Sequence, residues 1–337
     1  NMAMYDLMGK YLEVPAWKLI GPQVRSRIPV AAWTVSQVPE ALAEEVKQAH
    51  SLGYRWLKYH CDEVQNVEDQ VAAMEAVAPG DFRLHLDLNM NAQFDDVLPL
   101  MKRLDKHAIV GRLEDPITAA VPSDWSRLRE ELETPVVAHH GPRDFLVRGL
   151  CDGYMAGHAP IGHAVRTAAI AESVELPIML QQCGGQINQA FLAHEASVFP
   201  TATMDHVNLA RLWKDDITGT ISPIESGSIA VPEGPGLGVT VQMDKVQHYA
   251  AVAAPQYEPF LVRIRYQQGP TIYTRHDAHQ PGATDSLRFL GRLLGAKFPG
   301  PAPRYDNAVR TDMLDEADGA EFTRYWKATE KVRFVVE

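Results

Sequence analysis

Four residues that carry charge or can titrate recur along the chain at nearly constant spacing. They are Lys58, Asp87, Glu114 and His140, which lie 29, 27 and 26 residues apart. An ammonium group, two carboxylates and an imidazole gathered in one place would make a charged site for a small polar molecule. The spacing is that of a repeated strand–helix unit, so the elements around these residues decide whether they meet.

Short β-rich apolar runs alternate with amphipathic helical stretches from residue 28 to about residue 209. The helical stretches have apolar residues three and four positions apart, and they include 66–77, 94–105, 124–133, 164–174 and 190–199. The strands are expected at 28–35, 54–60, 83–89, 109–114, 135–140, 153–157, 177–182 and 204–209. Eight strands in this order predict an α/β fold, a TIM-like (β/α)8 barrel with remnants of an α+β capping domain.

The spaced polar residues fall at the ends of successive predicted strands. They therefore share one height, at the carboxyl-terminal rim where barrel enzymes build their sites. Strand side chains alternate between faces, so Lys58 and His60 share a face, as do Asp87 and Asn89. His139 and His140 point to opposite faces, so an error of one residue would exchange them at the rim.

Composition and charge exclude several classes of protein. The 337 residues are 46% hydrophobic and 22% charged, with a formal net charge of −11, which is typical of a globular protein. The chain contains no block of Lys and Arg residues. Nucleic acid and anionic membranes are therefore disfavoured as its main partners. Neither a signal peptide nor a membrane span is predicted, and three cysteines without C-x-x-C spacing favour a reduced, cytoplasmic setting.

Six motifs, in order, resemble the enolase superfamily, in particular its mandelate racemase and muconate-lactonizing branch. Together they cover residues 3–243 at the spacing of the barrel repeat. They are AMYDLMGKYLEVPAWKLIG (3–21), GYRWLKYH (53–60), DLN (87–89), LEDP (113–116), TPVVAHH (134–140) and VPEGPGLGV (231–239).

The resemblance implies a divalent metal held by the ends of the third, fourth and fifth strands. Carried over by position, the ligands are Asp87, Glu114 and His140, the last standing where the family has a carboxylate. Mg²⁺ is the ion expected from the family. An imidazole ligand also suits Mn²⁺, Fe²⁺ or Zn²⁺, so these ions are alternatives. The alternative for Asp87 and Glu114 is ordinary ion pairing with Arg83 and Arg112.

The resemblance also implies proton abstraction next to a substrate carboxylate, through an enediolate. The family's base motif, K-x-K, reads Lys58-Tyr59-His60 here, so Lys58 and His60 are the candidate catalytic residues. Lys58 could instead be a structural cation that balances Asp87 and Glu114.

The second base of the family's racemases is missing, because the aligned positions are Gly157 and Gln182. The reaction that is still expected is the dehydration of a sugar acid or a related hydroxy-carboxylate. In this reaction His158 would be the acid that protonates the leaving hydroxyl. The residues expected to contact the substrate are Asn89, Gln182 and Asn208. The alternative is a barrel that has lost catalysis and serves for carboxylate binding or assembly.

Three regions are expected along the chain: the end of a capping domain (1–27), the barrel (28–238), and an extension returning toward the cap (239–337). Most of the family's capping domain precedes the helix at residues 3–11, so we expect it to be missing from this chain. The extension should contain a strand at 260–266 and helices at 284–294 and 320–332. The apolar stripe of the 284–294 helix and the family precedent suggest a homo-oligomer.

Overall fold

The strands between residues 27 and 208 form a closed parallel barrel. The computed structural model describes residues 1–61, 66–89, 92–156, 161–219, 222–253, 260–276, 309–332 and 334–337. The strand order is β7-β6-β5-β4-β3-β2-β1-β9-β8, and β7 and β8 are two pieces of one strand interrupted at Leu180. The bounds are β1 (Arg27–Val35), β2 (Trp56–His60), β3 (Arg83–Asp87), β4 (Val110–Glu114), β5 (Val136–Ala138), β6 (Gly153–Met155), β7 (Ile178–Met179), β8 (Gln181–Gln182) and β9 (His206–Asn208).

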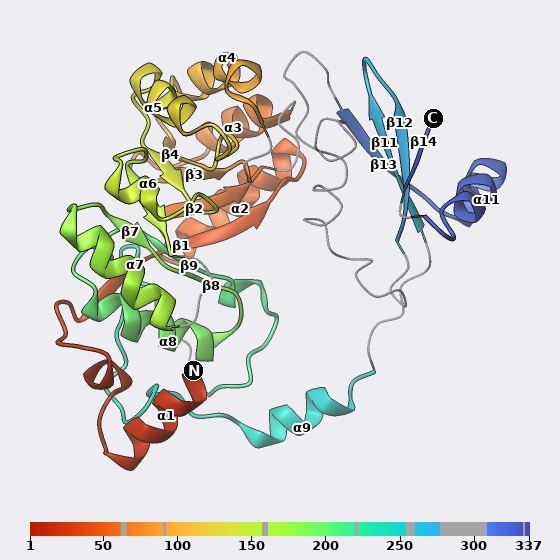
Figure 1. Cartoon of the computed structure of the whole chain (residues 1–337). Helices are drawn as coiled ribbons and strands as arrows, with labels where there is room; N and C mark the ends of the chain where they lie inside the picture. The colour runs from red at the N-terminus through yellow and green to blue at the C-terminus, as the bar shows by residue number, and fades with distance from the viewer. Residues whose placement is uncertain are drawn as a thin grey trace.

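This arrangement confirms the predicted (β/α)8 barrel, with each predicted strand found within a few residues of its expected bounds (Figure 1). Helices follow the strands, as expected. They are α2 (Pro39–Ser51), α3 (Val67–Glu75), α4 (Phe94–Leu104), α5 (Pro122–Glu131), α6 (Asp144–Val147), α7 (Ile161–Ser173) and α8 (Gln186–Val198).

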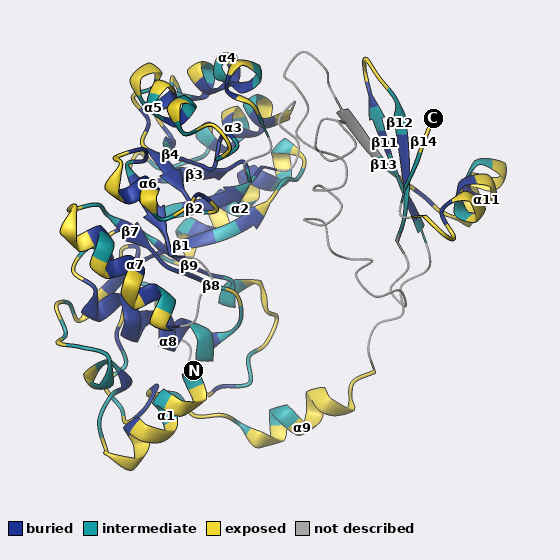
Figure 2. Ribbon diagram, in the orientation of Figure 1, coloured by how far each residue is buried: buried dark blue, intermediate teal, exposed yellow. Residues whose placement is uncertain are grey.

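Most residues of the barrel strands are buried (Figure 2), and their apolar side chains lie on both faces of the sheet. The outer face packs against the helices; in α4, for example, Phe94, Val97 and Leu104 are buried at helical spacing. A smaller cluster fills the barrel interior, and it contains Ala31, Val137, Met155, Met179, Met204 and Val207. Because both faces are buried, the strands read as continuous apolar runs, without the alternation of a half-exposed sheet.

The first and last motifs of the sequence pack against each other beneath the barrel. Helix α1 (Met2–Tyr11) is followed by the 3₁₀ helix η1 (Ala16–Leu19). Asp6 Oδ1 accepts a hydrogen bond of 2.9 Å from the Leu237 amide. A Cβ atom on Gly9 would lie 2.7 Å from Gly236 Cα, so both positions need glycine for this close approach.

The C-terminal region forms a small antiparallel sheet with its own apolar clusters. Its strands are β11 (Phe260–Tyr266), β12 (Thr271–His276), β13 (Val309–Leu314) and β14 (Phe334–Val336), in the order β13-β11-β12-β14. Helix α11 (Gly319–Ala328) contributes Phe322 and Tyr325 to one cluster. The strand predicted at 260–266 and the helix predicted at 320–332 are thus present, whereas the helix predicted at 284–294 lies outside the described residues.

The remaining elements are short. Strand β10 (Ser228–Ala230) pairs antiparallel with the start of β1, and α9 (Met243–Ala251) follows the Pro/Gly segment after it. Two 3₁₀ turns, η3 (Ala210–Leu212) and η4 (Glu316–Asp318), are the remaining described elements of secondary structure. Within the described residues, no helix combines the length and hydropathy needed to cross a membrane.

Candidate active site at the mouth of the barrel

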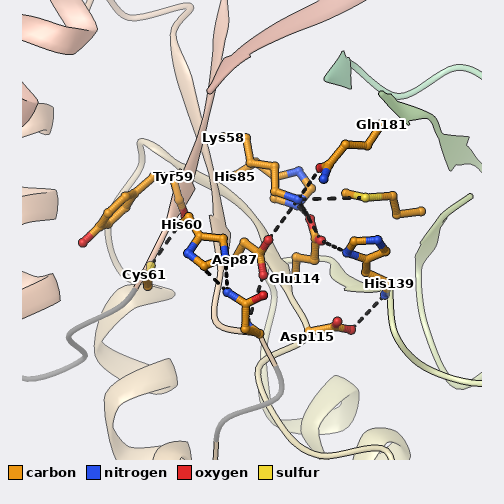
Figure 3. Close-up of polar contacts among 12 residues, drawn as sticks. Lys58, Tyr59, His60, Cys61, His85, Asp87, Glu114, Asp115, His139 and Gln181 are labelled. Carbon is orange, nitrogen blue, oxygen red and sulfur yellow. Dashed lines mark hydrogen bonds and ion pairs between the residues drawn. The ribbon is translucent and has the colours of Figure 1, made fainter. Parts of the chain in front are cut away.

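The ammonium group of Lys58 occupies the centre of a buried polar cluster inside the barrel (Figure 3). Its Nζ lies 2.9 Å from Asp87 Oδ2 and 2.8 Å from each oxygen of Glu114. Gln181 Oε1 accepts a further hydrogen bond of 2.9 Å from it. Neighbouring parallel strands bring these groups together, since Lys58 pairs with His85 in β3, and Asp87 pairs with Glu114 in β4.

Burial and charge set the protonation of this cluster. Burial opposes the charged form of Lys58, but Asp87 and Glu114 outweigh it and raise the Lys58 pKa. Burial also disfavours the ionised form of Glu114, yet Lys58, His139 and His85 hold the pKa of this carboxyl well below its usual range. The pKa of Asp87 is raised by burial and by the nearby charge of Glu114. The two carboxylates thus favour the ammonium form of Lys58.

Two histidines lie against Glu114 from the strands on either side. His85 Nε2 lies 2.6 Å from Glu114 Oε2, and His139 Nδ1 lies 3.0 Å from Glu114 Oε1. Burial lowers the pKa of His85, which favours its neutral form. Neither histidine is among the predicted site residues, although His85 and Asp87 share a face of β3.

The structure groups His139, and not His140, with Asp87 and Glu114. One ligand atom from each of Asp87, Glu114 and His139 lies within 4.8 Å of the others. His140 instead contacts Asp115, with Nδ1 2.6 Å from Oδ2, and this hydrogen bond raises the His140 pKa. Asp115, His139 and His140 form a second group that satisfies the same 4.8 Å limit. Of the three predicted ligands, Asp87 and Glu114 thus lie together with His139, and His140 belongs to the second group.

Gln182 and Asn208 show the same shift of one residue. Gln181 points toward Lys58, whereas Gln182 donates a hydrogen bond of 2.8 Å to Glu195 on α8. Asn208 donates to the backbone carbonyl of Gln182, while its neighbour Val207 belongs to the interior cluster. Two of the three residues expected to contact a substrate, Gln182 and Asn208, are thus directed away from the polar cluster.

His60 and Asn89 lie together at the rim. The Asn89 amide hydrogen-bonds to the imidazole of His60, and the Asn89 backbone amide donates a bond of 3.0 Å to Asp87 Oδ1. Asn89 has a positive φ of 54°, a conformation that asparagine tolerates better than most residues. Both side chains are half-buried. The predicted acid His158 and its neighbour Gly157 lie outside the described residues.

The donor set of the cluster fits a divalent cation. Two carboxylates and one imidazole suit Mn²⁺, Fe²⁺ or Zn²⁺, and the carboxylates also suit Mg²⁺. The Lys58 ammonium touches the same two carboxylates, so a bound cation would share them with it.

Known proteins resemble this chain over the barrel. Residues 41–245 match the family described as enolase C-terminal domain-like. D-gluconate dehydratase of Thermoproteus tenax is 22% identical over 275 residues, covering 74% of this chain and 55% of that protein. D-xylonate dehydratase of Haloferax volcanii is 26% identical over 278 residues, covering 73% of this chain and 67% of that protein. The chain thus spans about half the length of the first relative.

A solved structure gives the same fold. The mandelate racemase/muconate lactonizing family protein from Azoarcus sp. EbN1 superposes with a TM-score of 0.66 at 23% identity, covering 75% of this chain and 73% of that chain. At this identity the likeness establishes the fold alone.

Proposed function

The chain belongs to the enolase C-terminal domain-like family, and on that basis we propose that it is a lyase that removes water from a sugar acid or a related hydroxy-carboxylate. The names of the gluconate and xylonate dehydratases that it resembles support this substrate class. The observation that carries the proposal is the meeting of Lys58, Asp87, Glu114 and His139 in one barrel.

Asp87, Glu114 and His139 would hold a divalent cation, and we propose Mg²⁺ first, with Mn²⁺, Fe²⁺ or Zn²⁺ as alternatives. His140, one residue further, remains the alternative third ligand through its group with Asp115 and His139. When bound, the cation supplies positive charge that stabilises the enediolate formed from the substrate carboxylate.

Lys58 contributes a second, permanent positive charge. Its buried ammonium is held by four acceptor atoms of Asp87, Glu114 and Gln181. It would attract the substrate carboxylate and stabilise charge that develops there in the transition state. Because its proton is retained, we assign the base to another residue.

His60 is that base in our proposal. Its imidazole lies at the rim beside Asn89, where Asn89 can also orient a substrate hydroxyl. His60 would take the proton from the carbon next to the carboxylate. The electron pair left behind then expels the hydroxyl on the following carbon, which leaves as water after protonation by an acid. His158 remains our candidate for that acid, and the resulting enol tautomerises to the 2-keto-3-deoxy acid.

Exchange of the substrate α-proton in D₂O tests the chemistry directly. The full chain, loaded in turn with Mg²⁺, Mn²⁺ and Zn²⁺, would be incubated with gluconate, xylonate, galactonate and arabinonate and followed by NMR. We expect exchange and keto-acid formation with at least one acid. Glu114→Gln and His60→Ala should abolish both, whereas the exposed-site controls Glu13→Gln and His248→Ala should not.

A binding barrel without catalysis is the second candidate, and the bridging position of Lys58 favours it. The ammonium already satisfies Asp87 and Glu114 without a metal. If the metal-loaded chain exchanges no proton and forms no keto acid with any of the four acids, the lyase proposal is overturned in favour of this candidate.

A further inference from the structure

In the described residues no α-helix directly follows the last barrel strand, and a cavity lies beside the chain that follows this strand. Seven strands are followed by an α-helix, but β9 is followed by the 3₁₀ turn η3 and, in residues 213–219 and 222–227, by irregular chain. A cavity of about 400 Å³ lies between this segment, the start of α8 and the end of α2. None of the residues proposed for catalysis or metal binding lines it.

Three buried polar side chains face this cavity. Tyr54, Gln186 and Gln189 line it, although they are only 3%, 6% and 5% exposed. Within the described part of the chain, neither the Tyr54 hydroxyl nor either side-chain amide has a hydrogen-bond partner. None of their polar atoms is among the fully enclosed unpartnered atoms of the described residues, so these groups open onto the cavity and can bond to a ligand in it.

Most of the charged groups on the cavity wall are already paired, the exposed Lys214 being an exception among the described lining residues. Asp216 accepts hydrogen bonds from the backbone amide of Gln186 and from the backbone amide and hydroxyl of Thr218. Lys245 lies 2.7 Å from Asp215, and Arg211 is paired with Glu45. The groups left to bind a ligand are therefore mainly neutral donors and acceptors, and hydroxyl groups match them because each hydroxyl can both donate and accept.

An aromatic ring completes the wall. Trp213 lines the cavity and is 59% exposed, so its ring is available to cover the apolar face of a sugar ring. We propose that this cavity binds a neutral monosaccharide or polyol, at a site separate from the barrel mouth. The proposal goes beyond the dehydratase function and does not depend on it.

Calorimetric titration of the full chain with D-glucose, D-galactose, D-xylose and sorbitol, each up to about 100 mM, tests the proposal. At least one should bind saturably. Tyr54→Phe and Gln189→Leu should each weaken that binding about tenfold, the order expected for one lost hydrogen bond. Tyr11→Phe changes a tyrosine that is 81% exposed and should have no effect.

Further variants locate the ligand and guard against misfolding. Trp213→Ala alters an exposed side chain, so weaker binding in this variant supports the proposal even if a buried variant fails to fold. Asn89→Ala should leave the affinity unchanged. The proposal is overturned if no compound binds saturably, if binding persists unaltered in all three cavity variants, or if Asn89→Ala abolishes it, which would place the sugar at the barrel mouth.

Discussion

At the scale of single residues, the site depends on a buried lysine that balances two buried carboxylates. Lys58 and Glu114 are fully buried and Asp87 is 2% exposed. Removing one partner from such a group leaves an uncompensated charge, which is strongly destabilising. A divalent cation bound as proposed would share the carboxylates with this lysine, so stability and metal binding should be linked through it.

Lys58→Met should therefore destabilise the metal-free protein by about 3–5 kcal/mol. It should also tighten the binding of Mn²⁺ or Zn²⁺, because the competing ammonium is gone. Urea unfolding with and without the ion, together with calorimetric titration, checks both effects. Lys106→Met, at an exposed lysine, is the matched control, and an unaltered metal affinity in Lys58→Met would contradict the competition.

Glu195, on α8, is another buried carboxyl. Burial raises the pKa of Glu195 to about 8, although the hydrogen bond from Gln182 opposes this shift. The unfolded chain ionises this group near its ordinary pKa of about 4.3. Between these two pKa values Glu195 is protonated in the folded state and ionised in the unfolded state. The free energy of unfolding that protonated Glu195 contributes therefore falls as the pH rises from the lower pKa to the higher one.

Glu195→Gln should remove that dependence, because the amide has no proton to lose. The unfolding free energy of the variant minus that of the wild type should rise by about 1.4 kcal/mol per pH unit between pH 5 and pH 8. Chemical denaturation at half-unit steps measures it. A flat difference, equal to that of the exposed control Glu13→Gln, would show that Glu195 is ionised in the folded protein.

At the scale of elements, the face of each strand decides which of two neighbouring polar residues enters the site. In β8, Gln181 contacts Lys58 and Gln182 contacts Glu195. At the end of β5, His139 reaches Glu114 and His140 reaches Asp115. A shift of one residue exchanges the faces of a strand, which accounts for the differences from the motif alignment.

The two adjacent glutamines give a direct test of this assignment. Gln181→Met removes an acceptor from Lys58 and should lower the rate of α-proton exchange about tenfold or more. Gln182→Met should have a smaller effect on exchange, because its side chain points to α8. Exchange rates for both variants, with the same metal and acid, decide the matter. A larger loss in Gln182→Met would instead support the alignment of Gln182 with the substrate.

At the scale of the whole molecule, the barrel and the C-terminal sheet have separate apolar cores. The three clusters of the barrel region share no described residue with the two clusters of the C-terminal sheet. Regions with their own cores can fold independently. The barrel should therefore keep its stability and its metal site without the sheet.

A chain ending at residue 253 should unfold in one cooperative transition, with a barrel stability within about 1 kcal/mol of that in the full chain. Its affinity for Mn²⁺ should also be unchanged. Denaturation followed by tryptophan fluorescence and metal titration provide the comparison, with the full chain as control. Aggregation or a loss of metal binding would show that the C-terminal region supports the barrel.

The sequence by itself determined the barrel, because the alternation of strand and helix is local and the repeat spacing of Lys58, Asp87 and Glu114 follows from it. Local patterns also identified the strand at 260–266, but not β13 or β14, whose pairing partners lie far along the chain.

Only the tertiary structure decided which polar residues face the interior. Strands buried on both faces carry apolar residues on both, so hydropathy does not distinguish Val136 from Val137, or His139 from His140. The cavity beside η3 was equally hidden, since segments far apart in the sequence line it: the end of α2, the start of α8 and the chain after η3. Closure of the barrel fixes the orientation of every strand at once, and that constraint is not present in any single segment of the sequence.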